Sequence, residues 1–488
     1  MVYLGSKKCH DTGDRSFYDA IMVDRTIMGN ELIIKNGCLF SPESGEAGCL
    51  PDYFIPQGYK SRCLEDSLID LSRQAAQLSF IRIESGTIKE VGPMDQLNLD
   101  MDCQVIDASE CLMMPGLVNG HCHGAMTLFR GLADDLELMD WLENHIFPAE
   151  AKCVTPEMVY WCSKLAAAEM LRGGITTVAD GYFYEDSAAR AFADAGMRAV
   201  VAQGVVDFPA PGVPDPARKI QVVSDFVDLW KNHKRIVPAV FAHSPYTCGP
   251  DTLKEAKDLA RSKDCLFFIH LGETKQEAEG IKSKTGLSPV GYLQSLHLLD
   301  ESTVCIHCVW LDQEDINILA QNNAKVVTCP ESNMKLASGI SPVKELVDAG
   351  VIVGLGTDGA ASNNDLNMFR EMGSCFLLQN HAHLHRPALS ELNVLEMATS
   401  GGAAVLGLEN LVGSIEPGKK ADIVLMDLGR FNMQDMSTVH NLIHSVSGSE
   451  VTTVIVDGEV ILKNREIVSF DEHEAMEKVR HLARKVKG

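Results

Sequence analysis

The segment from about residue 112 to 406 repeats one unit, a short apolar run followed by a helical pattern. The apolar runs lie at about 112–123, 175–180, 199–207, 237–245, 265–273, 303–311, 325–330 and 351–357. Helical signals separate most of them, for example Thr155-Pro156, which places a capping residue before a proline at the first helical position. Such repeats predict parallel strands, and eight of them favour an α/β fold closed into a (β/α)₈ TIM barrel over an open sheet.

Strand-like patterns with turn residues flank this repeat at both chain ends, near 31–37 and 79–92 and again near 421–426 and 451–462. We expect the two ends to join into one small β-sandwich-like domain. The predicted parts are residues 1–111 with an insertion of unknown role at about 44–75, the barrel over 112–406, and residues 407–488, which end in a helix at about 471–486.

The formal net charge of −24 argues against nucleic-acid or anionic-membrane partners, because both require basic surfaces. No stretch approaches the roughly 18 apolar residues of a membrane helix, and the first 30 residues contain no apolar core of a signal peptide. The 15 cysteines are scattered within apolar runs, which is typical of reduced core thiols. We therefore expect a cytoplasmic protein, and we expect it to be a homo-oligomer, either a dimer or a tetramer.

Polar residues fall at the ends of several predicted barrel strands, where the active sites of such barrels lie. His121 and His123 end the first strand, and their spacing of two puts both imidazoles on one face. His270 ends the fifth strand, His307 lies in the sixth, and Asp358 ends the eighth. Each residue alone has an ordinary explanation as a hydrogen-bonded strand end, but their coincidence at one rim predicts a shared site.

Three histidines with a single carboxylate form a nitrogen-rich ligand set suited to one divalent transition metal. Binuclear hydrolases of this architecture usually need a bridging carboxylate or modified lysine on the fourth strand. The corresponding run, Ala239-Val240-Phe241-Ala242-His243, contains no lysine. We therefore expect a mononuclear site, with zinc as the first choice of metal and Fe(II) as the second.

Five sequence blocks together resemble the amidohydrolase superfamily, and most closely its methylthioadenosine/S-adenosylhomocysteine deaminases and related triazine hydrolases. These blocks are Pro115-Gly116-Leu117-Val118-Asn119-Gly120-His121-Cys122-His123, Met126-Thr127-Leu128-Phe129-Arg130-Gly131, Ile269-His270-Leu271-Gly272-Glu273-Thr274, Ile306-His307-Cys308-Val309, and Leu355-Gly356-Thr357-Asp358-Gly359-Ala360-Ala361-Ser362-Asn363.

The resemblance implies specific roles for these residues. It implies that His121, His123, His270 and Asp358 bind the metal. It also implies catalytic roles for Glu273 as the proton shuttle, for His307 as the group that orients and polarises the attacking water, and for Asp358 as the acceptor of the water proton.

The resemblance extends to the substrate pocket. Trp141 and Glu150 match positions that line the nucleoside pocket of the deaminases, where Glu150 would bind ribose hydroxyls and His243 would contact the nucleoside. Gln203 stands where an arginine is usual for binding the amino-acid carboxylate of S-adenosylhomocysteine, and Arg218 is a candidate for a second such position.

The expected function is therefore hydrolytic deamination of an aminated N-heterocycle, a small-molecule substrate of the adenosine type, with release of ammonia. Three alternatives stay open: a triazine-type chlorohydrolase, an N-alkylaminohydrolase, and a deaminase of another heterocycle such as guanine or a pterin. A metal-free scaffold protein would be expected to lack ligands that this chain contains.

Overall fold

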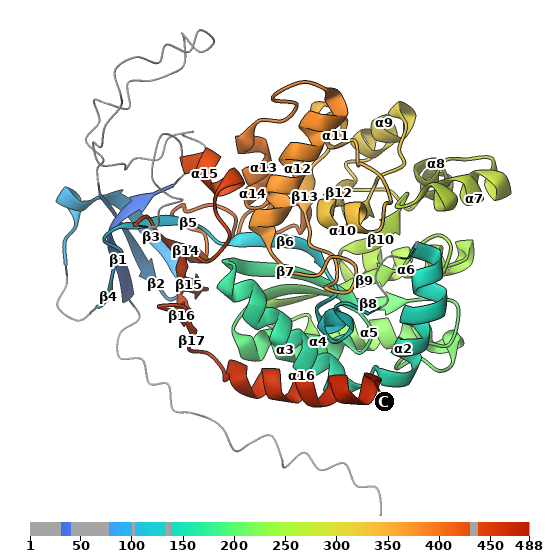
Figure 1. Ribbon diagram of the computed structural model, residues 1–488, viewed down its shortest axis with the longest axis horizontal. Coiled ribbons are helices and arrows are strands. Elements are labelled where there is room, and N and C mark those ends of the chain that lie inside the picture. The colour runs from blue at the N-terminus through green and yellow to red at the C-terminus, as the bar shows by residue number, and fades with distance from the viewer. Residues whose placement is uncertain are drawn as a thin grey trace, which may run out of the picture.

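The computed structural model describes residues 31–40, 78–99, 103–132, 136, 138–429 and 438–487. Residues 1–30 and the predicted insertion at 44–75 lie outside this described part of the chain. The described part forms a barrel flanked by helices and, beside it, a separate sheet (Figure 1).

Eight parallel strands form the barrel, in the spatial order β13-β12-β11-β10-β9-β8-β7-β6. The predicted (β/α)₈ barrel is therefore confirmed. The strands are β6 (Leu117–Cys122), β7 (Ile175–Tyr182), β8 (Arg198–Val205), β9 (Ile236–Ala242), β10 (Phe267–Leu271), β11 (Thr303–His307), β12 (Lys325–Thr328) and β13 (Val353–Leu355).

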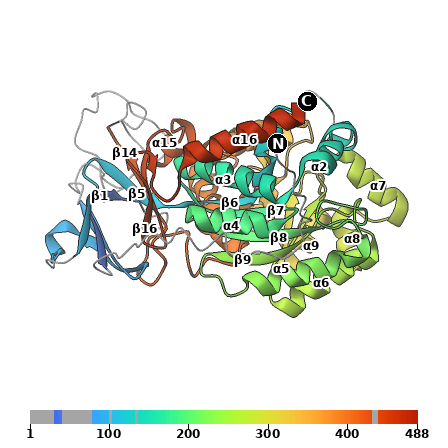
Figure 2. The same ribbon diagram turned by 90° about the horizontal axis from the view of Figure 1, so that it is seen from below.

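Helices connect the strands and surround the barrel (Figures 1 and 2). They include the 3₁₀ segments η4 (Gly124–Phe129) and η6 (Pro216–Arg218) and the π-helix η5 (Leu142–Ile146). The α-helices up to β13 are α1 (Leu138–Trp141), α2 (Phe147–Cys153), α3 (Pro156–Arg172), α4 (Glu185–Ala195), α5 (Lys219–Trp230), α6 (Pro250–Lys263), α7 (Lys275–Thr285), α8 (Pro289–Ser295), α9 (Gln313–Gln321), α10 (Pro330–Lys335) and α11 (Val343–Asp348). After β13 come α12 (Met368–His383), α13 (Glu391–Met397), α14 (Ser400–Val405), α15 (Thr438–His444) and α16 (Glu472–Lys487).

The barrel closes where the end of β13 meets β6. The Asp358 amide donates a hydrogen bond of 3.0 Å to the His121 carbonyl. The side chain of Asn119, which is fully buried, accepts from the Thr357 amide at 3.0 Å and donates to the Thr357 hydroxyl at 2.7 Å. These bonds join the first strand of the barrel to the segment after the last one.

The sequence predicts one strand over 112–123, but the structure contains two strands with different partners. β5 (Cys111–Pro115) pairs antiparallel with β14 (Ile423–Asp427) outside the barrel, whereas β6 pairs with β7 inside it. Gly116 separates them, and a Cβ atom there would lie 2.1 Å from the hydroxyl of Thr176. The apolar pattern is continuous because both strands are buried, so the change of sheet leaves no mark except this glycine.

The strands from the two chain ends form one nine-stranded mixed sheet, which confirms the predicted small β-domain. Its order is β17-β16-β15-β14-β5-β1-β2-β3, and β4 pairs with β1. The further strands are β1 (Glu31–Leu39), β2 (Ser79–Glu84), β3 (Thr87–Pro93), β4 (Gln104–Asp107), β15 (Val451–Val456), β16 (Glu459–Lys463) and β17 (Glu466–Ile467), with the 3₁₀ segment η3 (Met94–Gln96) after β3.

A buried ion pair connects this sheet to the barrel. Arg198, the first residue of β8, donates from Nε to Asp422 Oδ2 at 2.8 Å and from Nη2 to Oδ1 at 3.0 Å. At the chain end, α16 packs along α3, and Arg172 Nε donates to Glu472 Oε2 at 2.8 Å (Figure 2).

Among the described residues no helix is long and apolar enough to cross a membrane.

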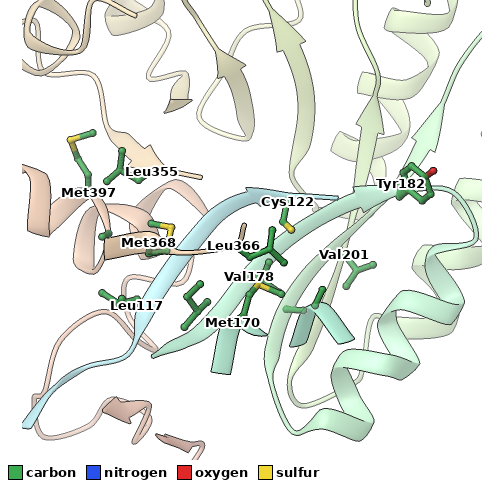
Figure 3. Packing of buried hydrophobic residues seen from close by; sticks show 14 of the residues in the cluster. Leu117, Cys122, Met170, Val178, Tyr182, Val201, Leu355, Leu366, Met368 and Met397 are labelled. Carbon is green, nitrogen blue, oxygen red and sulfur yellow. The ribbon is translucent and has the colours of Figure 1, made fainter. Parts of the chain in front are cut away.

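The main apolar core lies between the barrel strands and the surrounding helices. Leu117, Val178 and Val201 come from three neighbouring strands and belong to one buried cluster with Met170 of α3 (Figure 3). A second cluster inside the barrel contains the alternate residues of the strands, such as Val200 of β8. Cys122 points into the outer core, away from the two histidines beside it, as the alternation of a strand requires (Figure 3).

Candidate active site

The predicted metal ligands converge at the carboxyl end of the barrel strands. His121 lies in β6, His123 directly after it, His270 in β10, and Asp358 follows β13. All four residues are buried. Their ligand atoms form two groups that share His121, and within each group all ligand atoms lie within 4.8 Å of one another. One group is His121, His123 and Asp358, and the other is His121, His270 and His307, the last residue of β11.

The separations between these atoms match those of a coordinated metal. Oδ1 of Asp358 lies 3.5 Å from His121 Nε2 and 3.3 Å from His123 Nε2. The Nε2 atoms of His121 and His270 are 3.3 Å apart. Tetrahedral ligands at about 2.0–2.1 Å from zinc are separated by roughly 3.3 Å. A cation placed among these atoms would accept the lone pairs of both imidazole nitrogens and the charge of Asp358, so the group fits a divalent metal ion.

Neighbouring groups fix the orientation of these ligands. His123 Nδ1 bonds to the Gly181 carbonyl, which leaves Nε2 directed at the site. Asp358 Oδ2 accepts hydrogen bonds from Ser332 Oγ at 2.6 Å and Ser362 Oγ at 2.7 Å. Such second contacts set the tautomer and the direction of a ligand before the metal arrives.

The backbone is strained at two of the site residues. His307 has φ 71° and Asp358 has φ 59°, both in the left-handed region that residues with a Cβ rarely occupy. His307 is the last residue of β11 and Asp358 follows the end of β13, so both lie where a strand gives way to a turn. Strain of this kind persists only where the surrounding structure enforces it, and it is concentrated at functional sites.

His307 and Glu273 face each other beside the ligand group. His307 Nε2 lies 3.8 Å from Glu273 Oε2, while its Nδ1 bonds to Asn333 Oδ1 at 3.0 Å. Because Asn333 offers an acceptor, Nδ1 of a neutral His307 carries the proton and Nε2 carries a lone pair. The turn before Glu273 is held by Glu277, which accepts from the Gly272 and Glu273 amides at 2.9 Å.

Burial shifts the proton affinities of these groups in opposite directions. It raises the pKa of Glu273 to about 8, with help from the negative charge of Asp358. It lowers the pKa of His121 to about 4, although the hydrogen bond with Asp358 opposes that change. Burial also raises the pKa of Asp358, but the hydrogen bond with His121 and the nearby His123 and His307 more than offset this and hold the pKa well below its usual range. At neutral pH the site therefore combines a protonated Glu273 with an ionised Asp358.

A cavity of about 470 Å³ opens from the ligand group toward solvent. Trp141, Glu150 and His243 all line it, as do Glu273 and His307. Burial raises the pKa of Glu150 to about 7, against the hydrogen bond that Tyr182 donates at 2.6 Å. Burial and the neighbouring His123 lower the pKa of His243 to about 3, so this ring is neutral at physiological pH.

Two predicted substrate residues do not line this cavity. Gln203 lies on the outer face of β8, where its Oε1 accepts from the Glu185 amide at 3.1 Å. Arg218 is exposed at the end of η6. The described residues that line the cavity include no lysine and no arginine.

Sequence reasoning missed the residues that hold the site in place, namely Asn119, Tyr182, Glu277, Ser332, Asn333 and Ser362. Asn119 and Ser362 lie inside the sequence blocks that resemble the superfamily, and Glu277 had a local signal. Thr274 and Glu277 have the spacing of a capping box, and Thr274 Oγ1 accepts from the Glu277 amide at 3.2 Å. The carboxylate of Glu277 turns instead to the two amides before the helix.

The model of the Amidohydrolase family matches residues 112–461. Among curated relatives, the 5-methylthioadenosine/S-adenosylhomocysteine deaminase of Syntrophobacter fumaroxidans is 41% identical over 409 residues, covering 83% of this chain and 93% of the relative. A protein with the same name, numbered 1, from Syntrophus aciditrophicus is 42% identical over 384 residues, covering 78% and 87% of the two chains.

Solved structures show the same fold. An adenosine deaminase from Xanthomonas campestris with bound zinc superposes with a TM-score of 0.84 at 32% identity and covers 93% of this chain and 98% of its own. An atrazine chlorohydrolase from Arthrobacter aurescens TC1 complexed with zinc superposes with a TM-score of 0.79 at 21% identity, covering 93% and 100%. With the family match and the relatives above 40% identity, these findings establish that the chain belongs to the amidohydrolase family.

Proposed function

We propose that this protein hydrolytically deaminates an adenosine-type nucleoside. The observation that carries the proposal is the clustering of His121, His123, His270 and Asp358 beside Glu273, whose pKa burial raises to about 8 and which lines the same cavity as three of them. The names of the relatives at 41–42% identity and of the zinc-containing neighbour support the same reaction. We propose zinc as the metal, with Fe(II) as the alternative.

A bound divalent metal supplies the nucleophile by lowering the pKa of its water toward about 7. The residues of the chain manage the protons. Asp358 is ionised and can accept the water proton, and the Nε2 lone pair of His307 can accept a hydrogen bond that orients the water. Glu273 holds the proton that the ring nitrogen beside the attacked carbon needs.

The balance of the reaction follows from these roles. A C–O bond forms at the amino-bearing ring carbon as Glu273 protonates the adjacent ring nitrogen. The C–N bond to the amino group then breaks, and the proton held by Asp358 leaves with the nitrogen as ammonia. The proton of the added hydroxyl group passes to the Glu273 carboxylate, which restores the acid. The product carries a carbonyl group where the substrate carried its amine.

The other residues that line the cavity indicate which substrate groups it can bind besides the nucleobase. Glu150 and Tyr182 form a buried acceptor–donor pair suited to ribose hydroxyls. Past them the walls are apolar, with Leu138, Phe147, Phe208, Pro209 and Pro211. Because no described lining residue is a cation, a zwitterionic amino-acid tail would be desolvated without a partner for its carboxylate. We therefore propose methylthioadenosine, whose 5′ group is apolar, as a better substrate than S-adenosylhomocysteine.

Three further predictions concern features outside the cavity. Gln203 and Arg218 remain predictions as substrate contacts, and methylthioadenosine needs neither of them. A homo-oligomer, dimer or tetramer, also remains a prediction, which analytical ultracentrifugation would test.

The decisive experiment is a release assay with the zinc-loaded protein. Ammonia would be measured with methylthioadenosine, adenosine, S-adenosylhomocysteine, guanine and a pterin, and chloride and alkylamine with atrazine. We expect methylthioadenosine to give the highest kcat/KM. Chloride or alkylamine release from atrazine without ammonia release from any nucleoside would overturn the proposal, and guanine or the pterin as best substrate would overturn the nucleoside assignment.

A further inference from the structure

A second group of metal-binding side chains lies away from the candidate active site. It consists of His440 and His444 of α15 and Glu391, the first residue of α13, whose ligand atoms all lie within 4.8 Å of one another. His440 Nδ1 is 2.8 Å and His444 Nε2 is 3.1 Å from the same carboxylate oxygen, Oε1 of Glu391. Two imidazoles thus converge on one oxygen atom.

The local structure holds these three side chains in register. His440 and His444 are four residues apart on a helix, so their rings lie on one face, with centroids 4.5 Å apart. Phe376 of α12 packs edge-on against the His444 ring at 4.9 Å. Ser390 caps α13 by accepting from the Asn393 amide, which positions Glu391 at the start of that helix. The geometry is therefore supported from three helices.

We propose that His440, His444 and Glu391 bind a second divalent transition-metal ion, for which zinc is the best match. Two imidazoles and one carboxylate are a known zinc ligand set that leaves a position for water. The side chain of His440 is 46% exposed and that of Glu391 26%, so the ion can enter from solvent and keep a water ligand.

This group is separate from the one at the barrel rim. The Ala398 carbonyl, at the end of α13, accepts from the Val118 amide at the amino end of β6, whereas His121 and His123 lie at the carboxyl end of that strand. The bound ion would link α13, which packs on the barrel, to α15, the last helix before β15 of the small sheet (Figure 1). Its role would be structural, a cross-link near the junction of the two parts.

The proposal is tested by counting metal ions. Protein stripped with a chelator is dialysed against free zinc, and bound zinc is measured by elemental analysis. We expect two equivalents per chain for the wild type and one for the double variant H440Q/H444Q, which should still release ammonia at the wild-type rate. A wild type that binds only one equivalent, or a double variant that binds two, would overturn the proposal.

Two additions keep the test decisive. The variant H473Q/H481Q removes two exposed histidines from α16 and should keep both equivalents. If H440Q/H444Q does not fold, Glu391→Gln replaces it and should weaken binding of the second ion at least tenfold. Paramagnetic resonance of the second Cu²⁺ equivalent should also show two nitrogen ligands in the wild type, and spectra without nitrogen coupling would refute the assignment.

Discussion

Asp358 and His121 are joined through both backbone and side chain. The Asp358 amide donates to the His121 carbonyl at 3.0 Å, and Oδ1 of the same aspartate lies 3.5 Å from His121 Nε2. The closure of the barrel and the assembly of the metal-binding group therefore depend on the same pair of residues. A change that loosens the closure should also weaken metal binding.

Asn119 provides the test of this coupling, because it supports the closure without itself offering a ligand atom to the metal, and its Oδ1 also accepts from the His121 amide at 3.3 Å. Its side chain bonds to the Thr357 amide and hydroxyl and is fully buried. Asn119→Ala leaves the Thr357 amide without its acceptor, whereas the Thr357 hydroxyl still donates to the Asp358 carbonyl, and we expect a cost of about 1–3 kcal/mol in the free energy of unfolding. Urea denaturation should show this loss, and the zinc Kd should rise in parallel.

The matched control is Asn317→Ala, which removes an exposed asparagine from α9. It should change the free energy of unfolding by less than about 0.5 kcal/mol and leave the zinc Kd unchanged. If Asn119→Ala destabilised the fold but kept the wild-type zinc Kd, barrel closure and metal binding would be independent.

Glu273 should set the alkaline limit of activity. An acid whose pKa is raised to about 8 is protonated below that pH and ionised above it. Since the ring nitrogen needs the protonated form, kcat/KM should be level near neutral pH and fall tenfold per pH unit above about 8. A profile measured from pH 6 to 10 that stays level through pH 10 would contradict this role.

Glu273→Gln removes the proton donor but keeps the shape of the side chain. The variant should lose about 10²–10⁴-fold in kcat while binding the same amount of zinc. Ser262→Ala, on the exposed surface of α6, serves as the control for handling and should retain full activity. Full activity of the glutamine variant would remove Glu273 from the mechanism.

Glu150 should act on substrates that carry a ribose and not on the reaction itself. Glu150→Gln weakens an acceptor for hydroxyl groups and should cost about 1.5–3 kcal/mol in binding, which appears as a KM raised about 10–100-fold with kcat changed less. Glu143→Gln changes an exposed acid that lines the same cavity and should leave KM near its wild-type value. Equal KM effects in both variants would point to general electrostatics instead of a ribose contact.

Much of the barrel rim could be predicted from two regularities of the sequence. One is the repeat of strand and helix along the chain, and the other is the alternation of side chains between the two faces of a strand. Alternating strand and helix patterns identify the barrel, and strand ends then identify residues such as His270 and Asp358. The alternation of side chains along a strand also explains why Gln203 does not line the cavity. Val200 and Ala202 of β8 belong to the cluster inside the barrel, so the alternation places Gln203 on the outer face. Correct use of that rule requires the strand register, which one sequence does not provide.

The supporting residues could not be predicted for a different reason. Asn333 and Ser332 approach His307 and Asp358 only because α10 follows β12, and β12 lies between β11 and β13 in the barrel. Their contacts are long-range, and short polar residues at a helix start have an ordinary interpretation as caps. The division of 112–123 into β5 and β6 was equally hidden, since both strands are buried and read as one apolar run.

The pair of Arg198 and Asp422 should be important for holding the small sheet on the barrel. Both side chains are almost completely buried, and the two hydrogen bonds are parallel. Asp422→Asn leaves the guanidinium buried beside a neutral group, which costs about 3–5 kcal/mol. Thermal denaturation should show a lower Tm or a separate early transition. Lys231→Ala, which removes an exposed ion pair with Asp228, should shift Tm by less than about 2 °C.

The absence of a cation in the described cavity wall leads to a change in specificity that can be engineered. Phe208 is 38% exposed at the outer wall, where its ring lies 5.9 Å from that of Phe147. Phe208→Arg places a guanidinium where the tail of S-adenosylhomocysteine would end and removes apolar surface that a methylthio group would contact. The ratio of kcat/KM for S-adenosylhomocysteine to that for methylthioadenosine should rise about tenfold or more, as expected for a charge-assisted hydrogen bond of about 1.5–3 kcal/mol.

Phe208→Leu keeps the wall apolar and should leave the ratio within about threefold of the wild type, since it introduces no donor for the carboxylate. An unchanged ratio in the arginine variant would mean that the tail does not reach this wall, and wild-type protein that already prefers S-adenosylhomocysteine would refute the charge argument itself.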